Sequence, residues 1–331
     1  MSLTVPAPHA IIEVVGEDGA RFRVRRHGVA RGPRLLLSHG NGFGIDGYFH
    51  FWRRFLDAFD VLVFDMRSHG QIPRADPAHH DYAHMTRDLD AICRAVGDAF
   101  GAKPTAGLFH SMSAQCAMLQ ALAGTGEFAA LVLFDPPNVP RPGHAVRVKM
   151  AEYEHKLAHW ARHRRDHFDD PLALANEYAS TRSGRHWAAG TAKLMARAVL
   201  QPDPAGGWAL ACPKELEASM YLQGIPLGLW PKCRQFAAGQ ADRRRPRRAL
   251  PGRDRPVEPG LGRRRRVRLR RDPRYQPPLA ARGAGRVRRR CARVSARGRV
   301  PGLTRVSSRR RPGPTGPLSE MLKGGSRPPP G

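Results

Sequence analysis

The chain has 331 residues, a formal net charge of +28 and a pI near 11.4. The charge is unevenly placed, because residues 234–331 hold 30 Lys and Arg against 5 Asp and Glu, which gives them +25 and leaves residues 1–233 at +3. The five cysteines form no CxxC pair, and no apolar run reaches the roughly 18 residues of a membrane span. The first residues lack the basic and apolar regions of a signal peptide. We therefore expect a cytoplasmic protein without disulfides, metal, cofactor or membrane contact.

The first 70 residues contain the signals of a sheet. Residues 10–15 and 21–28 are predicted to form paired strands around the turn "GEDG". "RLLLSHG" and "DVLVFDMR" are compact apolar runs, typical of central strands that are covered on both faces. The segment between these two runs, residues 47–59, has helical spacing.

Strands and helices then alternate. Residues 82–101 are predicted to form a helix, with apolar positions at Met85, Leu89, Ile92 and Val96 and a terminal Gly101. The strand "AGLF", a helix from Ser111 to about residue 123 and the strand "ALVLFD" follow. This alternation predicts a doubly wound, mostly parallel α/β sheet.

Beyond residue 139 the pattern changes twice. Helices alone are expected at 144–165, 171–180, 190–200 and 213–222, which suggests a helical cap over the end of the sheet. From about residue 232 the periodicity gives way to Arg, Pro and Gly. We therefore divide the chain into a core (1–139), a cap (140–230) and a tail (231–331), for which we expect irregular, disordered structure.

Three turns that follow strands carry candidate site residues. Open α/β sheets place their sites at the carboxyl ends of the strands. The glycine-rich turn "SHGNGFG" can present a backbone N–H, that of Asn41, as a donor to an oxyanion. Ser111 lies between a strand and a helix, where the N–H of Met112 would be a second donor. Asp135 either accepts a hydrogen bond from a histidine or forms a turn with Pro136.

The order "LLLSHGNGFG", "VLVFDMRSHGQ", "AGLFHSMSA", "LVLFDPP" and then a helical cap resembles the α/β-hydrolase superfamily over about residues 10–230. The resemblance implies a Ser–His–Asp catalytic triad that acts on an ester-like or related acyl small molecule. Ser111 would be the nucleophile, and the N–H groups of Asn41 and Met112 the oxyanion hole. The family has a G-x-S-x-G elbow at this place, whereas this chain has Phe109-His110-Ser111-Met112-Ser113, in which both glycines are replaced.

Each motif also has a structural interpretation. Ser111 could be only a helix N-cap. His39 and His110 are expected to be scaffold residues, and "DMRSHGQ" is expected to organise a loop through Asp65, Arg67 and His69. The remaining motifs are interpreted as structural: His79, His80 and His84 as a solvated loop rather than a metal site, Cys116 as packed core, and "HWARHRRDHFDD" as a solvated helix face.

The tail leaves the resemblance incomplete. A serine nucleophile needs a base, yet the last histidine of the chain is His186. "ADRRRPRRALPGRDRP" and "GRRRRVRLRRDPRYQPP" are not expected to build the final strands of the sheet. If the tail is genuine, it is a basic arm that binds nucleic acid or an anionic surface.

A frameshift explains the same composition. Arginine codons of the form CGN become GNN when they are read one base later, and GNN encodes Val, Ala, Gly, Asp and Glu. In that frame "GQADRRRP" permits V-K-L-I-G-A-D-P, a strand ending in aspartate, and "DPRYQPPLA" permits I-P-G-T-N-H-L-L-Q, which contains a histidine. We therefore expect a frame change near residues 231–239. The chain as written is then an impaired serine hydrolase, and the alternative is a non-catalytic hydrolase domain with a polybasic arm.

Overall fold

A computed structural model of the chain describes residues 3–126, 128–230 and 268–270. Its centre is a sheet in the order β1-β2-β4-β3-β5-β6-β10, in which β2 runs antiparallel to β1 and β4 and the remaining pairs are parallel. The strands are β1 Ala10–Val15, β2 Arg21–Gly28, β3 Arg34–Ser38, β4 Asp60–Phe64, β5 Thr105–His110, β6 Ala130–Phe134 and β10 Arg268–Arg270. The doubly wound, mostly parallel sheet predicted from the sequence is confirmed.

Neighbouring residues of the central strands enter different cores, because successive side chains of a strand point to opposite faces. Leu36 of β3 packs in one cluster with α2 (Tyr82–Phe100) and α3 (Met112–Ala123). Leu35 and Leu37 belong to the other cluster, which includes α1 (Phe49–Trp52) and apolar residues of the cap. Both faces of the sheet are therefore covered, as the continuous apolar runs predicted.

The helix α2 has the boundaries that its sequence indicated. Asp81 precedes it, and one carboxylate oxygen of Asp81 accepts a hydrogen bond from the His84 N–H at 2.7 Å. Gly101 ends the helix with φ of +76°. The predicted apolar positions Met85, Leu89, Ile92 and Val96 are all buried. By contrast, the helix expected at 47–59 is only one turn, α1, between two short 3-10 helices.

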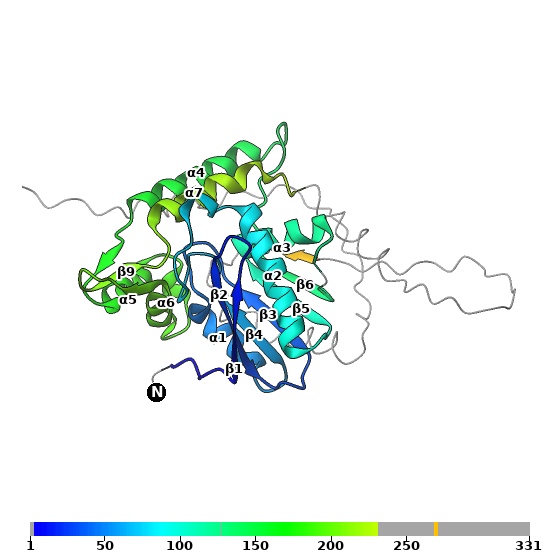
Figure 1. The fold of residues 1–331 in the computed structure, drawn as a ribbon. Coiled ribbons are helices and arrows are strands. Elements are labelled where there is room, and N and C mark those ends of the chain that lie inside the picture. Colours follow the sequence, from blue (N-terminus) through cyan, green and yellow to red (C-terminus); the bar gives the residue numbers. More distant parts are fainter. Residues whose placement is uncertain (1–2, 127, 231–267, 271–331) are drawn as a thin grey trace, which may run out of the picture.

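The cap consists of four helices and a small sheet. In Figure 1, α4 and α7 lie side by side above the end of the central sheet, while α5 and α6 lie to one side. The cap helices are α4 Arg147–His163, α5 Pro171–Ser180, α6 Thr191–Val199 and α7 Lys214–Gly224, with short 3-10 helices at Gly184–His186 and Ile225–Leu227. The 3-10 helices Ile45–Tyr48, Arg53–Phe55 and Pro77–His79 belong to the core.

The expectation of helices alone in the cap was wrong. Strands β7 (His167–Phe168), β8 (Leu200–Pro202) and β9 (Trp208–Leu210) form a second sheet in the order β7-β9-β8. Strands of two or three residues are too short to show an alternating pattern. The hairpin between β8 and β9 turns through Gly206 and Gly207, which both have positive φ.

The expectation that the tail adds no strand was also wrong at one place. Arg268–Arg270 pairs in parallel with β6, with Arg268 opposite Val132 and Arg270 opposite Phe134. Backbone pairing does not depend on an apolar side-chain pattern, so the arginine-rich sequence concealed it. The rest of the tail, with the expected disorder and frame change, lies outside the described residues.

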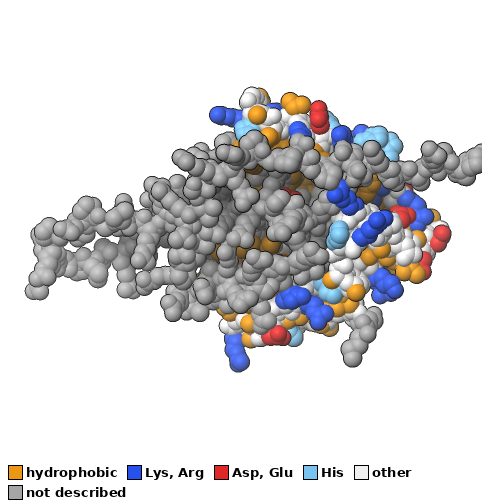
Figure 2. Space-filling model, turned by 180° about the vertical axis from the view of Figure 1, so that it is seen from behind, with side chains coloured by type: hydrophobic (Ala, Val, Ile, Leu, Met, Phe, Trp, Pro, Cys, Tyr) orange, Lys and Arg blue, Asp and Glu red, His pale blue; other side chains and the backbone are white. Residues whose placement is uncertain are grey.

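On the part of the described surface that is visible in Figure 2, Lys and Arg side chains lie dispersed, with some Asp and Glu side chains among them. This agrees with the near balance of charge in residues 1–233. Among the described residues, no helix combines the length and the apolar character needed to cross a membrane.

Candidate active site

Ser111 has the backbone geometry of a strained turn between β5 and α3. Its φ is 49° and its ψ is −112°. Positive φ is uncommon outside glycine, and such strain gathers at functional sites. The conformation is held in place because the Ser111 N–H donates to the Phe134 carbonyl oxygen of β6 at 2.9 Å. Ser111 is half-buried, and its side chain makes no capping hydrogen bond with α3, so the N-cap interpretation does not account for it.

The two departures from the glycine-rich elbow are accommodated by packing. Phe109 is fully buried and meets Phe128 edge to face, with ring centroids 5.5 Å apart. The Ser113 hydroxyl accepts a hydrogen bond from the His110 N–H at 3.1 Å and donates one to the His110 carbonyl oxygen at 3.0 Å. Phe109 therefore packs into the core beneath the elbow, and Ser113 ties its first turn together.

The glycine-rich turn lies directly against Ser111. A Cβ placed on Gly40 would lie 3.1 Å from the Ser111 Cβ and 2.6 Å from the His110 Nδ1. The next residue, Asn41, is one of the two predicted oxyanion donors. The other, Met112, is the first residue of α3, where a backbone N–H has no acceptor inside the helix. The fold thus brings Asn41, Ser111 and Met112 into one neighbourhood.

The Asn41 side chain and the Gly42 N–H both donate hydrogen bonds that fix the glycine-rich turn. The Asn41 Nδ2 donates to the Glu217 carbonyl oxygen of the cap at 2.8 Å. The Gly42 N–H donates to the Nε2 of His69 at 3.1 Å. The turn therefore connects the core to α7 of the cap.

His39 and His110 have the scaffold roles expected for them. His39 uses both ring nitrogens on the backbone, since Nδ1 lies 2.8 Å from the Gly40 carbonyl oxygen and Nε2 accepts the Met66 N–H at 3.0 Å. His110 is buried, and its Nδ1 lies 2.7 Å from the Tyr48 hydroxyl. Burial lowers the pKa of His39 to about 4 and that of His110 to about 3, so both rings are neutral near pH 7.

Asp135 lies at the end of β6, beside the nucleophile turn, with φ of 43°. Across from it, the cap contributes the buried Glu154 of α4. Burial and the nearby Asp135 charge together raise the pKa of Glu154 to about 8. A cap carboxyl with a raised pKa therefore lies close enough to Asp135 to feel its charge, and the sequence analysis did not single out Glu154.

The "DMRSHGQ" segment organises a loop, as expected. The Asp65 carboxylate accepts the backbone N–H of Ile45 at 2.7 Å and that of Gln71 at 3.4 Å. The buried Arg67 guanidinium pairs with Asp88 at 2.8 Å and also with Asp18. Asp65 thus joins the loop to Ile45, after the glycine-rich turn, and Arg67 joins it to α2 and to the turn between β1 and β2.

Two expectations about polar side chains near the cap were wrong. His80 is not part of a solvated loop, because it is buried against His69 with ring centroids 5.8 Å apart. Arg164, predicted to lie on a solvated helix face, has a side chain that is only 7% exposed and pairs with Glu217 at 2.9 Å. A pocket beside the glycine-rich turn is lined by Gly42, Phe43, His69, Arg164, Cys212 and Glu217. Cys116 is fully buried, as expected.

Residues 32–201 match the model of a family described as serine aminopeptidase, S33. A comparison with curated protein sequences found no match.

Three solved structures resemble the chain at similar levels. E-2-(acetamidomethylene)succinate hydrolase is 20% identical, with a TM-score of 0.54 and coverage of 68% of this chain and 77% of that chain. An α/β hydrolase from Novosphingobium aromaticivorans DSM 12444 is 20% identical, with a TM-score of 0.57 and coverage of 71% of this chain and 80% of that chain. A thioesterase domain from the curacin biosynthetic pathway is 14% identical, with a TM-score of 0.53 and coverage of 70% of this chain and 80% of that chain. At these low identities, the TM-scores show a shared fold and nothing more.

Proposed function

This chain belongs to the serine aminopeptidase S33 family of the α/β-hydrolase superfamily, and on that premise we propose that it is a serine hydrolase of ester-like or related acyl small molecules. The observation that carries the proposal is Ser111, held at φ 49° and ψ −112° between a central strand and a helix. Such a turn presents a serine hydroxyl at the end of the sheet where this superfamily places its nucleophile.

The proposed reaction proceeds through an acyl-enzyme. The Ser111 hydroxyl attacks the acyl carbon, and a base takes its proton. The N–H groups of Asn41 and Met112 stabilise the negative charge that develops on the carbonyl oxygen. The leaving group departs with the proton, and water then hydrolyses the acyl-enzyme. Asp135, next to the nucleophile turn, is the candidate for the acid that orients the base.

The histidines nearest to Ser111 do not supply that base. Both nitrogens of His39 are engaged with backbone groups, and His110 is buried against Tyr48. Because no histidine follows His186 in the sequence, we propose that the chain as written is catalytically impaired. The base would be restored by a one-base frame correction near residues 231–239, which permits a histidine in place of residue 277.

The experiment compares covalent labelling by a fluorophosphonate, which reacts with activated serines. The full chain should label slowly, and the product of a one-base-corrected gene should label and hydrolyse a short acyl ester at least about a hundredfold faster. Ser111→Ala should remove labelling from both proteins, whereas the control Ser180→Ala, on an exposed position of α5, should leave it unchanged. Labelling that survives Ser111→Ala would refute the assignment.

A second candidate function is favoured by the charge of +25 on residues 234–331. It is a non-catalytic hydrolase domain that binds nucleic acid or an anionic surface through its basic arm. A steep loss of DNA affinity with rising salt, together with an intact reading frame across codons 225–245, would support this function over the enzyme.

A further inference from the structure

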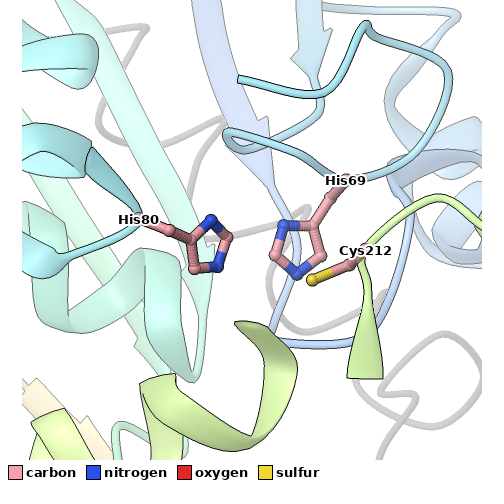
Figure 3. A group of neighbouring side chains, drawn as sticks. All are labelled: His69, His80 and Cys212. Atoms are coloured by element: carbon pink, nitrogen blue, oxygen red, sulfur yellow. The ribbon is translucent and has the colours of Figure 1, made fainter. Parts of the chain in front are cut away.

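We propose that His69, His80 and Cys212 form a binding site for a divalent transition metal of the zinc type at the junction of core and cap. Figure 3 shows the two imidazole rings and the thiol turned toward one another from three separate segments. One ligand atom from each residue lies within 4.8 Å of the other two. All three residues are buried, so the ligands do not face bulk water.

The donor set fits a soft divalent metal. Zinc is bound in proteins by thiolate and imidazole ligands, at about 2.3 Å for sulfur and 2.0–2.1 Å for nitrogen. Tetrahedral ligation at those lengths needs ligand atoms about 3.3–3.7 Å apart. The ligand atoms of the three residues lie within 4.8 Å of one another, so each pair would have to approach by about 1 Å at most to reach this spacing. Magnesium and calcium prefer oxygen ligands, which this cluster does not offer.

His69 already has the orientation of a ligating histidine. Its Nδ1 lies 2.7 Å from the Arg67 carbonyl oxygen, which can only accept, so Nδ1 carries the proton. Nε2 therefore holds the lone pair. Histidines that bind metals commonly donate their other ring N–H to a backbone carbonyl in this manner. In the structure the Nε2 lone pair accepts the Gly42 N–H at 3.1 Å, so a bound metal would exchange that hydrogen bond for a coordinate bond.

His80 provides the independent observation that points to a ligand. It is 3% exposed, yet neither of its ring nitrogens has a hydrogen-bond partner among the described residues. Buried polar atoms are nearly always paired, and each exception calls for an explanation. The backbone around His80 is well fixed, because its carbonyl oxygen accepts the Gln223 Nε2 of α7 at 3.2 Å. A metal ion would satisfy one of the two unpartnered nitrogens.

A pocket gives access to the site, and binding of the metal would release one proton. His69 and Cys212 both line the pocket beside Gly42, which offers a route for the ion and room for water as a fourth ligand. On binding, the Cys212 S–H bond breaks, the thiolate coordinates the metal, and the proton leaves to solvent. Because Cys212 follows β9 in the cap whereas His69 and His80 belong to the core, the metal would tie the two together.

The second cluster of possible ligands, Asp18, His79 and His84, lies nearer the surface. Asp18 is already committed to Arg67, which holds the pKa of the carboxyl well below its usual range through hydrogen bonds. This cluster has no sulfur, so spectroscopy distinguishes it from the site proposed here.

The test uses cobalt(II) as a probe of the full chain. Titration should give one Co²⁺ per chain with a near-ultraviolet charge-transfer band from sulfur and visible bands of tetrahedral intensity, and Zn²⁺ should displace it. The His80 ring makes no hydrogen bond with the described residues that a substitution would break. His80→Gln should therefore weaken Co²⁺ affinity about tenfold or more while the far-ultraviolet circular dichroism stays unchanged. Cys212→Ser should abolish the charge-transfer band, and the matched control Cys93→Ser should keep it.

Three results would overturn the proposal. They are the absence of a charge-transfer band in the wild-type chain, a band that persists in Cys212→Ser, and an affinity that His80→Gln leaves unchanged. Thermal unfolding gives a second readout, since a ligand of the folded state raises its Tm. At the same concentration, Zn²⁺ should raise the Tm of the wild-type chain and of Cys93→Ser by more than it raises that of His80→Gln.

Discussion

Substituting Gly40 by alanine should distort the nucleophile turn while leaving Ser111 itself unsubstituted. The added Cβ would lie 2.6 Å from the His110 Nδ1, 2.9 Å from its Cε1 and 3.1 Å from the Ser111 Cβ, whereas ordinary contact begins near 3.4 Å. One side must therefore move by about 0.8 Å. His110 cannot yield easily, because it is buried and bonded to the Tyr48 hydroxyl at 2.7 Å.

The size of the effect follows from that displacement. Forcing an extra methyl group into a packed site costs about 1–3 kcal/mol of stability. Moving a catalytic group by about 1 Å can cost about a hundredfold in rate. We expect Gly40→Ala to unfold at lower urea concentration and, in the frame-corrected protein, to lose about a hundredfold in fluorophosphonate labelling rate.

Gly97 provides the matched control. It lies inside α2, and a Cβ added there meets nothing within 4 Å. Gly97→Ala should stabilise the protein by about 0.5–1 kcal/mol, because alanine is the better helix residue, and should leave labelling unchanged. If Gly40→Ala matched Gly97→Ala in both measurements, the close packing of the glycine-rich turn against Ser111 would be refuted.

Three further outcomes can be measured. Arg67→Met should lower the free energy of unfolding in urea by about 3–5 kcal/mol, because it leaves the buried Asp88 unpaired. The control Arg23→Met, in the exposed pair with Glu13, should lower it by less than about 1 kcal/mol. Equal losses would contradict the buried pairing of Arg67. Because the pKa of Glu154 is raised from 4.5 to about 8 in the folded state, the unfolded chain ionises first, and this residue makes stability fall as pH rises through that window. Glu154→Gln should therefore stabilise the protein more at pH 8 than at pH 4, and a pH-independent effect would refute the burial of a neutral carboxyl. Correcting the frame by one base should remove most of the +25 charge of residues 234–331, which isoelectric focusing would show as a large fall in pI; an unchanged pI would count against the frame change.

The sequence alone was sufficient for the elements whose signals are local. The apolar runs of β3 and β4 indicated strands covered on both faces, and Leu35 and Leu36 indeed enter opposite cores. A 3.6-residue period and a terminal glycine defined α2. The nucleophile turn was also visible, because a strand, a serine and a helix follow one another directly in the chain.

The tertiary structure decided what depends on distant partners. Whether a polar side chain is solvated or buried is set by what packs on it. Neither the pairing of Arg164 with Glu217 inside the cap nor the packing of His80 against His69 could therefore be predicted from its own segment. The same reason applies to the Glu154 carboxyl close to Asp135 and to the approach of Cys212 to two core histidines, since these residues are far apart in sequence. Strands as short as β7, β8, β9 and β10 exist because a neighbouring strand pairs with them, and a pairing between backbones leaves no trace in the side-chain pattern.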